Sequence, residues 1–310
     1  MVDLQLPTAA TVVEVGPRDG LQSFSRWVDT AVKVEMIDRL SAAGLPVIEA
    51  VSFASPNAIP HLRDAEEVME RIKKRPGTTY RGLAPNRRGA ERALATGVDE
   101  IAGLVTASAT YTSKNQRMSI DQAVGEGVEA FRLADRAGRR FVMGIGMALW
   151  CPYEGRIPEA LVLDLTGRFW AAGVRSYVVA GSMGMEDPVH VAHLFSRLSE
   201  EFPGIEVAYH VHNMAGMATA NIVAALQAGV TAFEGSICGL GGGVATPRPI
   251  GNLPTEDIVQ LLNTSGLETG LSTTAVVEAA RDIADMLDLP HQSHALLYGT
   301  REDLLNPSHA

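Results

Sequence analysis

The sequence predicts an α/β protein with the fold of a (β/α)8 TIM barrel and a short helical C-terminal extension. Short β-branched segments alternate with longer amphipathic segments along the chain, which is typical of parallel βα units. Eight such units fit within about 250 residues, the usual size of this barrel. A doubly wound open sheet would alternate in the same way, and the count of eight units favours the barrel.

The predicted elements follow one another in a regular order. The strands are the β-branched segments Thr11–Val15, Pro46–Phe53, Thr79–Ala84, Glu100–Val105, Phe141–Met147, Ser176–Ala180, Glu206–Val211 and Thr231–Ile237. The helices between them have apolar residues at helical spacing and are Thr30–Ala43, Asp64–Lys74, Arg87–Thr96, Ile120–Ala137, Pro158–Ala172, Pro188–Phe202 and Met217–Ala228. Five of these helices end at a glycine in the C-cap position, namely Gly44, Gly97, Gly138, Gly173 and Gly229.

Two more helices, Thr255–Ser265 and Thr273–Leu287, follow the last strand and are expected to pack on the outside of the barrel. The chain contains no linker rich in Pro, Gly or Ser. We therefore expect one domain over residues 1–290, with a loosely held C-terminal tail over residues 291–310.

Composition excludes several classes of protein. Of the 310 residues, 46% are hydrophobic and 20% charged, which is enough apolar material for a core and argues against disorder. The net charge of −10 argues against nucleic-acid binding, which needs a basic face. Two cysteines cannot form a disulfide framework, the N-terminus lacks a signal peptide, and the uncharged segment 213–233 is too polar to span a membrane. We expect a soluble cytoplasmic protein.

Polar side chains gather where strands of the predicted barrel end, which is where such barrels carry their chemistry. The first strand leads into a segment with Arg18, Asp19 and Gln22, and the second carries Glu49 and Ser52. The seventh ends in His210-Val-His212-Asn213, and a glycine-rich loop after the eighth leads to Asn252.

The two histidines are the sharpest local signal. Residues two apart on a strand point to the same face, so His210 and His212 would both point into the barrel mouth. Together with the Asp19 carboxylate and the Asn252 amide oxygen they would form a mixed nitrogen and oxygen site for a divalent cation. Such a set suits Mg²⁺ or Mn²⁺, with Zn²⁺, Fe²⁺ or Co²⁺ also possible. The alternative is an accidental pair of histidines on a half-exposed strand.

Other motifs have structural explanations. The loop Gly239-Leu-Gly-Gly-Gly243 fits neither nucleotide-binding glycine pattern, and we interpret it as a lid, with a plain solvent loop as the alternative. Cys151 and Cys238 are expected to be small buried residues, with Cys238 on the eighth strand. An arginine-rich group is expected on a solvated helix face or beside an anionic ligand tail: Arg81, Arg87, Arg88 and Arg92.

The segment Glu14-Val-Gly-Pro-Arg-Asp-Gly-Leu-Gln22 resembles the opening signature of the 3-hydroxy-3-methylglutaryl-CoA (HMG-CoA) lyases in the DRE-TIM metallolyase superfamily. The resemblance runs over roughly residues 11–271. It continues through residues 48–56, Cys151-Pro-Tyr-Glu-Gly155, His210-Val-His212, residues 239–242 and residues 251–257.

The resemblance implies a metal-dependent retro-Claisen cleavage of HMG-CoA or a related 3-hydroxyacyl-CoA, giving acetyl-CoA and a keto acid. It implies a divalent cation on Asp19, His210, His212 and Asn252. Arg18 and His210 would be catalytic, with Arg18 stabilising the developing oxyanion. The predicted substrate-binding residues are Gln22, Glu49 and Ser52. The partner would be a small acyl-CoA, and the resemblance suggests a homodimer.

Two departures from the family pattern keep other functions open. Gly243 stands where the lyases carry a catalytic loop cysteine, and Ser182 stands where they carry an aspartate. Asn213-Met214 also replaces the Asp-Thr that follows the second metal histidine. The alternatives are a Claisen-type condensing enzyme, and a catalytically silent paralogue that binds a metal and a CoA ester.

Overall fold

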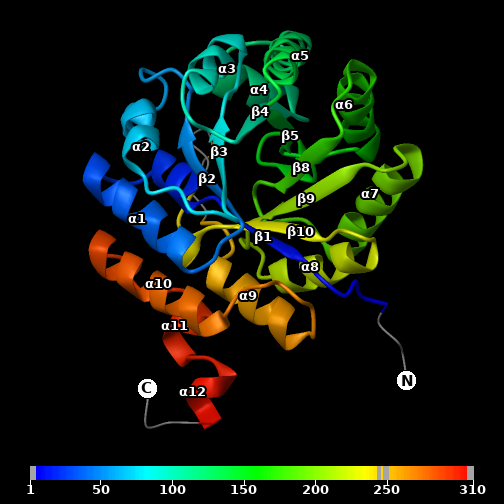
Figure 1. The fold of residues 1–310 in the computed structure, drawn as a ribbon. Helices are drawn as coiled ribbons and strands as arrows, with labels where there is room; N and C mark the ends of the chain where they lie inside the picture. Colours follow the sequence, from blue (N-terminus) through cyan, green and yellow to red (C-terminus); the bar gives the residue numbers. More distant parts are fainter. Residues whose placement is uncertain (1–4, 243–245, 247–250, 306–310) are drawn as a thin grey trace.

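A closed barrel of eight parallel strands forms the centre of the computed structural model, which describes residues 5–242, 246 and 251–305 (Figure 1). Around the barrel the strands follow the order β1-β10-β9-β8-β5-β4-β3-β2. Their bounds are β1 Thr11–Glu14, β2 Val47–Ser52, β3 Thr79–Leu83, β4 Glu100–Thr106, β5 Arg140–Gly146, β8 Ser176–Gly181, β9 Glu206–Val211 and β10 Ala232–Gly235. The predicted fold class is confirmed, and each strand lies within two residues of its predicted ends.

Helices surround the barrel as its outer layer (Figure 1). They are α1 Thr30–Ala42, α2 Ala65–Arg71, α3 Arg87–Leu94, α5 Ile120–Arg136, α6 Glu159–Ala172, α7 Pro188–Glu201, α8 Ala218–Gln227 and α9 Thr255–Thr264. Between barrel and helices lies one large cluster of buried apolar side chains. Helix α9 packs against β1 and β10 and so completes the eighth βα unit, while α10 (Thr273–Leu287) packs outside it against α9 and α1.

The last barrel strand is shorter than predicted. It ends at Gly235, and a 3-10 turn, η3 (Ile237–Gly239), follows it. Cys238 lies in this turn with φ of 58°, so the expectation that it sits on the strand is wrong. Both cysteines are buried, as predicted. A left-handed residue cannot continue a strand, and here it turns the chain toward the glycine-rich loop.

Several short elements carry no clear periodic pattern and were not predicted. These are the π-helical turn η1 (Gly16–Gly20), the 3-10 turn η2 (Pro60–Leu62), helix α4 (Ala109–Gln116), and a hairpin of β6 (Trp150–Cys151) with β7 (Gly155–Arg156). Three of them lie at the carboxyl ends of barrel strands, and they extend the wall of the barrel mouth.

The described part of the chain after Pro290 contains two short helices. It forms α11 (His294–Tyr298) and α12 (Arg301–Leu305), and Ser293 caps α11 by accepting from the Leu296 N–H. The Asp257 carboxylate accepts hydrogen bonds from the backbone of His294 and Ala295, and Ala295 is fully buried. Residues 293–298 are therefore in contact with the barrel layer, and the division into a domain over residues 1–290 and a tail over residues 291–310 stays a prediction. Among the helices of the described residues, none is long and apolar enough to cross a membrane.

Ionic side chains occupy part of the barrel interior. Five small or aliphatic residues form a separate apolar cluster there, namely Leu83, Ala102, Val142, Val178 and Ala208. Arg81 lies on β3 and is only 5% exposed, in contact with Glu100 and Glu234. It does not belong to a solvated helix face, because alternate residues of a barrel strand point inward. Arg87, on α3, is exposed as predicted.

Candidate active site

The π-helical turn after β1 places two of the predicted site residues at the barrel mouth. The Val15 carbonyl accepts hydrogen bonds from the backbone N–H groups of Arg18 and Asp19, at 3.1 and 2.7 Å. Gly16 is required at the start of the turn, because a Cβ there would lie 2.6 Å from the Glu14 Oε1 atom. These hydrogen bonds fix the backbone of Arg18 and Asp19 within the tight turn, and the fixed backbone sets the direction of both side chains.

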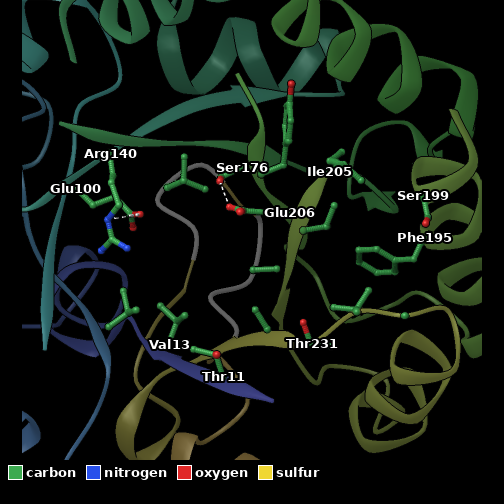
Figure 2. A pocket seen from close by; sticks show the side chains of 18 of the residues that line it. Thr11, Val13, Glu100, Arg140, Ser176, Phe195, Ser199, Ile205, Glu206 and Thr231 are labelled. Atoms are coloured by element: carbon green, nitrogen blue, oxygen red, sulfur yellow. Dashed lines mark hydrogen bonds and ion pairs between the residues drawn. The ribbon is translucent and has the colours of Figure 1, made fainter. Parts of the chain in front are cut away.

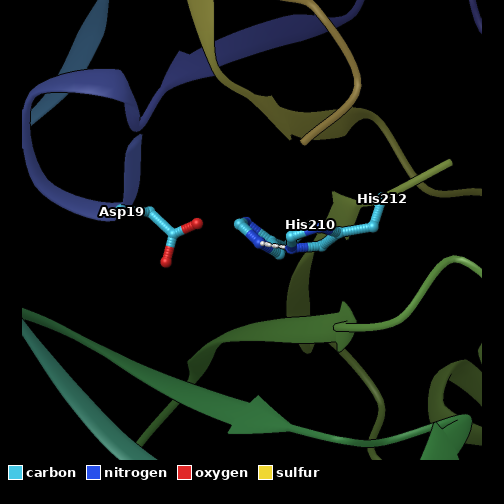
Figure 3. Close-up of side chains that lie close together, drawn as sticks. All are labelled: Asp19, His210 and His212. Atoms are coloured by element: carbon cyan, nitrogen blue, oxygen red, sulfur yellow. Dashed lines mark hydrogen bonds between the residues drawn. The ribbon is translucent and has the colours of Figure 1, made fainter. Parts of the chain in front are cut away.

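Asp19, His210 on β9 (Glu206–Val211) and His212 directly after that strand converge in the barrel mouth (Figure 3). One ligand atom from each of Asp19, His210 and His212 lies within 4.8 Å of the others, and all three residues are buried. The Nε2 atoms of the two imidazoles are 3.1 Å apart. Asn252 reaches the same place, since its Nδ2 group donates to Asp19 Oδ2 at 2.7 Å. The four predicted ligand residues are thus brought together.

Hydrogen bonds on the far side of each ring assign the imidazole tautomers. His212 Nδ1 lies 3.1 Å from the Gly251 carbonyl oxygen, which can only accept, so this nitrogen carries the proton. His210 Nδ1 lies 3.2 Å from Glu234 Oε2. Burial by itself would raise the pKa of Glu234, but Arg81 and His210 lower it overall, so the carboxylate is ionised and accepts from His210. His212 thus directs an unprotonated Nε2 atom at His210, and His210 directs its Nδ1 proton at Glu234.

This geometry fits a bound cation. The two Nε2 atoms lie 3.1 Å apart, an approach that a positive charge between them stabilises. Burial would lower the pKa of His210, but Glu234 and Asp19 raise it overall, so the site favours a positive charge at this position, either a proton on His210 or a metal cation in its place. Burial raises the pKa of Asp19, but Arg18 and the two histidines lower it on balance, so the carboxylate is available as an anionic ligand. Asn252 Oδ1 is buried and accepts no hydrogen bond from the described residues, which leaves the predicted amide oxygen available. Two nitrogen and two oxygen donors suit a divalent cation.

Arg18 lies between the cation site and the second strand. Its Nη1 group is 3.0 Å from Asp19 Oδ1, and its Nε group donates to Glu49 Oε1. Burial alone would lower the pKa of Arg18, but Glu49 and Asp19 raise it overall, so the guanidinium stays charged. Gln22 donates to Asp19 Oδ1 at 2.6 Å. The guanidinium and the Gln22 amide therefore hold the same carboxylate oxygen from two sides.

Two adjoining chambers open beside these residues. An inner chamber of about 100 Å³ is lined by Arg18, Glu49, His210 and Glu234, among others. An outer chamber of about 310 Å³ shares five lining residues with it, namely Arg18, Leu83, Leu104, Gly146 and Ser182. The outer wall combines apolar side chains such as Ile59 and Met118 with the amides of Asn86, Asn115 and Gln116. This mixture suits a partly apolar chain that carries amide groups.

The largest cavity described, of about 440 Å³, lies at the opposite, amino-terminal end of the barrel (Figure 2). Its lining includes Glu100, Arg140, Ser176 and Glu206, and none of the predicted site residues. Size alone therefore does not locate the site. We place the site at the other end, where the ligand-type atoms converge and the predicted residues meet.

The remaining predicted residues differ in how they relate to the chambers. Gln22 lines the outer chamber and Glu49 the inner one. Ser52 is buried, its hydroxyl accepts from the Ala54 N–H at 3.2 Å, and it lines neither chamber, so its role in substrate binding stays a prediction. Ser182 lines both chambers and accepts from the Met147 N–H at 2.9 Å. Gly243 lies outside the described residues.

Tyr111 is a functional candidate that the sequence did not reveal. It lies on α4 and lines the outer chamber together with Arg18, Gln22 and Ser182. Burial and the nearby negative charge of Asp19 raise the pKa of its phenol, which therefore keeps its proton at neutral pH. The polar sequence of α4 gave no periodic signal, and only the fold brings this hydroxyl to the site.

Comparison with known proteins agrees with this picture. The HMGL-like family model matches residues 9–283. The mitochondrial hydroxymethylglutaryl-CoA lyase of Bos taurus is 38% identical over 282 residues, covering 91% of this chain and 87% of the relative. Hydroxymethylglutaryl-CoA lyase YngG of Bacillus subtilis (strain 168) is 36% identical over 296 residues, covering 94% and 97%.

A solved structure gives the same result in three dimensions. The structure of an HMG-CoA lyase from Acinetobacter baumannii in complex with coenzyme A and 3-methylmalate aligns with a TM-score of 0.92. The two proteins are 33% identical, and the alignment covers 96% of this chain and 97% of that one. The likeness therefore extends over the whole barrel, including the strands that carry the candidate site.

Proposed function

The chain belongs to the HMGL-like family, and on that premise we propose that it is a divalent-metal-dependent oxo-acid lyase acting on a 3-hydroxyacyl-CoA. The substrate would be HMG-CoA or a close relative, cleaved to acetyl-CoA and a keto acid. The observation that carries the proposal is the pair of facing imidazole Nε2 atoms beside Asp19, with Arg18 next to them at the chambers. A cation-binding site and an oxyanion-binding guanidinium are the two groups that a retro-Claisen cleavage needs.

Asp19, His210, His212 and the Asn252 amide oxygen would hold the cation. A divalent cation bound there would act as a Lewis acid toward the oxygens of the substrate, with Mg²⁺ or Mn²⁺ proposed. With Nδ1 of His210 donating to Glu234 and Nε2 directed at the cation, neither ring nitrogen is left to move a proton. We therefore assign the predicted catalytic residue His210 the ligand role.

Arg18 would stabilise the product of bond cleavage. The hydroxyl proton of the substrate passes to solvent water, the new carbonyl forms at C3, and the electron pair of the C2–C3 bond moves onto the thioester as an enolate. The Nε and Nη1 groups of Arg18 are held by Glu49 and Asp19, which fixes the guanidinium plane and leaves Nη2 for the thioester oxygen. A preorganised cation of this kind lowers the energy of the enolate because its orientation needs no rearrangement.

A proton must then reach C2 to give acetyl-CoA. Tyr111 and Ser182 are hydroxyls on the chamber walls next to Arg18, and we propose them as the candidate donors. Neither is an ionisable acid of ordinary strength, so they would replace the loop cysteine and strand aspartate of the lyases with weaker acids. We expect slow turnover on HMG-CoA for this reason, since general acids contribute about 10²- to 10⁴-fold.

The test is to follow acetyl-CoA release from HMG-CoA and from citramalyl-CoA with protein loaded with Mg²⁺ or Mn²⁺. Release that depends on the metal supports the proposal, and the faster substrate identifies the acyl group. Metal binding and CoA-ester binding without any release would favour the silent paralogue instead. The homodimer and the cytoplasmic location remain predictions, which light scattering of the purified protein and cell fractionation would test.

A further inference from the structure

A single buried arginine connects the barrel interior to the candidate cation site. Arg81 is 5% exposed and lies inside the barrel on β3. Its Nη1 group is 2.5 Å from Glu234 Oε1 and 3.8 Å from Glu49 Oε2, and its Nε group is 2.5 Å from Glu100 Oε2. Two of these carboxylates in turn hold site residues: Glu234 accepts from His210, and Glu49 accepts from Arg18.

We propose that Glu234, whose other oxygen is held by Arg81, is a positioning residue that keeps the neutral ring of His210 in the tautomer whose Nε2 lone pair points into the cation site. The proposal concerns the metal-binding part of the proposed function and does not depend on the substrate. It rests on the hydrogen-bond chain Arg81–Glu234–His210, whose three members are each at least nine-tenths buried.

The chemistry of the chain determines the tautomer. A guanidinium has only donors, so it must meet an acceptor atom of residue 234. In the native protein the carboxylate has two acceptor oxygens, one for Arg81 and one for the Nδ1–H group of His210. In the neutral ring the far nitrogen of His210 is then left unprotonated toward His212. Groups that orient a histidine in this way typically contribute 10- to 100-fold to metal affinity.

Replacing Glu234 by glutamine tests this directly, because an amide has only one acceptor. In Glu234→Gln the amide oxygen must face Arg81, so the NH2 group faces His210 and forces Nδ1 to accept. We expect the imidazole proton to move to Nε2, visible in long-range ¹H–¹⁵N spectra of the metal-free protein. Titration calorimetry with Mn²⁺ should show a dissociation constant raised 10- to 100-fold.

Two double variants of equal net charge, both lacking Arg81, separate the acceptor role of residue 234 from simple damage to a buried ion pair. In the double variant Arg81→Met with Glu234→Gln, the amide oxygen can turn to His210. The native tautomer should then return, and the Mn²⁺ affinity should lie within about fivefold of that of the native protein. In Arg81→Met with Glu234→Met no acceptor remains, and the affinity should stay low. This pair also decides the matter if Glu234→Gln alone fails to fold.

Glu100→Gln is the matched control. Glu100 pairs with the same arginine, but on the side that faces the amino-terminal cavity, where Figure 2 labels it. Its amide oxygen can still accept from Arg81, and we expect Mn²⁺ affinity within about threefold of the native protein. The proposal would be overturned by a native tautomer and affinity in Glu234→Gln, by an equal loss in Glu100→Gln, or by no difference between the two double variants.

Discussion

Glutamine in place of Glu14 should stabilise the protein at alkaline pH. Glu14 is fully buried on β1, where its Oε1 atom accepts from the Gly16 N–H at 2.5 Å and the Ile237 N–H at 3.0 Å. Its Oε2 atom makes no hydrogen bond of good geometry with the described residues, although the Thr255 hydroxyl is near enough to lower the pKa of this carboxyl. In Glu14→Gln the amide oxygen can keep both backbone bonds, and the NH2 group can face the Thr255 hydroxyl oxygen without a charge.

The magnitude follows from the pKa of the Glu14 carboxyl, which burial raises from 4.5 to about 7. Because the folded protein holds this proton more tightly than the unfolded chain, the stabilisation is complete below pH 4.5 and is lost as the pH rises through 7. At roughly 1.4 kcal/mol per pH unit, the loss amounts to about 3 kcal/mol by pH 8. Glutamine has no such dependence, so the variant should be more stable than the native protein at pH 8 by up to about 3 kcal/mol.

Urea denaturation of metal-free protein at pH 5, 6, 7 and 8 measures this difference. The difference between the two curves of unfolding free energy against pH isolates the contribution of Glu14, because all other titratable groups are present in both proteins. Burial likewise raises the pKa of Glu256 to about 8, but that residue contributes equally to both curves. Parallel curves for the two proteins, or a variant less stable at pH 8, would refute the argument that an ionised Glu14 is costly inside this barrel.

Three predictions concern the site. His212→Ala should lower the metal content of purified protein sharply, and native occupancy should fall as the pH drops through the histidine range; an unchanged metal-to-protein ratio would refute the site. Arg18→Lys should fold and bind Mn²⁺ but lose most turnover, because lysine lacks the planar set of donors; near-normal kcat would make Arg18 structural. Tyr111→Phe should lower kcat about 10²-fold with little change in KM or metal affinity, and an unchanged kcat would leave Ser182 as the donor.

Much of the fold could be predicted from the sequence because its signals are local. Alternating βα units and a pair of histidines two residues apart are patterns within short segments of the sequence. The barrel topology then brings Asp19 to His210 and His212. Cys238 was misplaced because its left-handed backbone has no signal in side-chain periodicity. Helix α4 was missed since it is short and polar, and Tyr111 was missed with it.

The ionic part of the site could not be predicted for a different reason. Arg81 and Glu234 are 153 residues apart in the sequence. Their contact requires that both side chains point into the barrel interior at the same level along the barrel axis. In the sequence Arg81 stands near Arg87, Arg88 and Arg92, which suggested one basic surface. The strand and the helix that follow each other there point these side chains in opposite directions. Only the closed barrel distinguishes the buried Arg81 from the exposed Arg87 and Arg88 and the partly exposed Arg92.

The hydroxyls in the outer chamber change what the pH dependence of catalysis can report. Ser182 already accepts a hydrogen bond from Met147, but its own proton stays available to a substrate. The pKa of Tyr111 is raised above its ordinary value of 10 by burial and by Asp19, so this proton also remains in place throughout the neutral range. A lyase that used a thiol or carboxyl as its acid would lose activity when that group ionised. With a hydroxyl donor, loss of the acid cannot limit the rate below about pH 10, so pH dependence near neutrality must come from other groups, with metal binding and its histidine ligands the first to test.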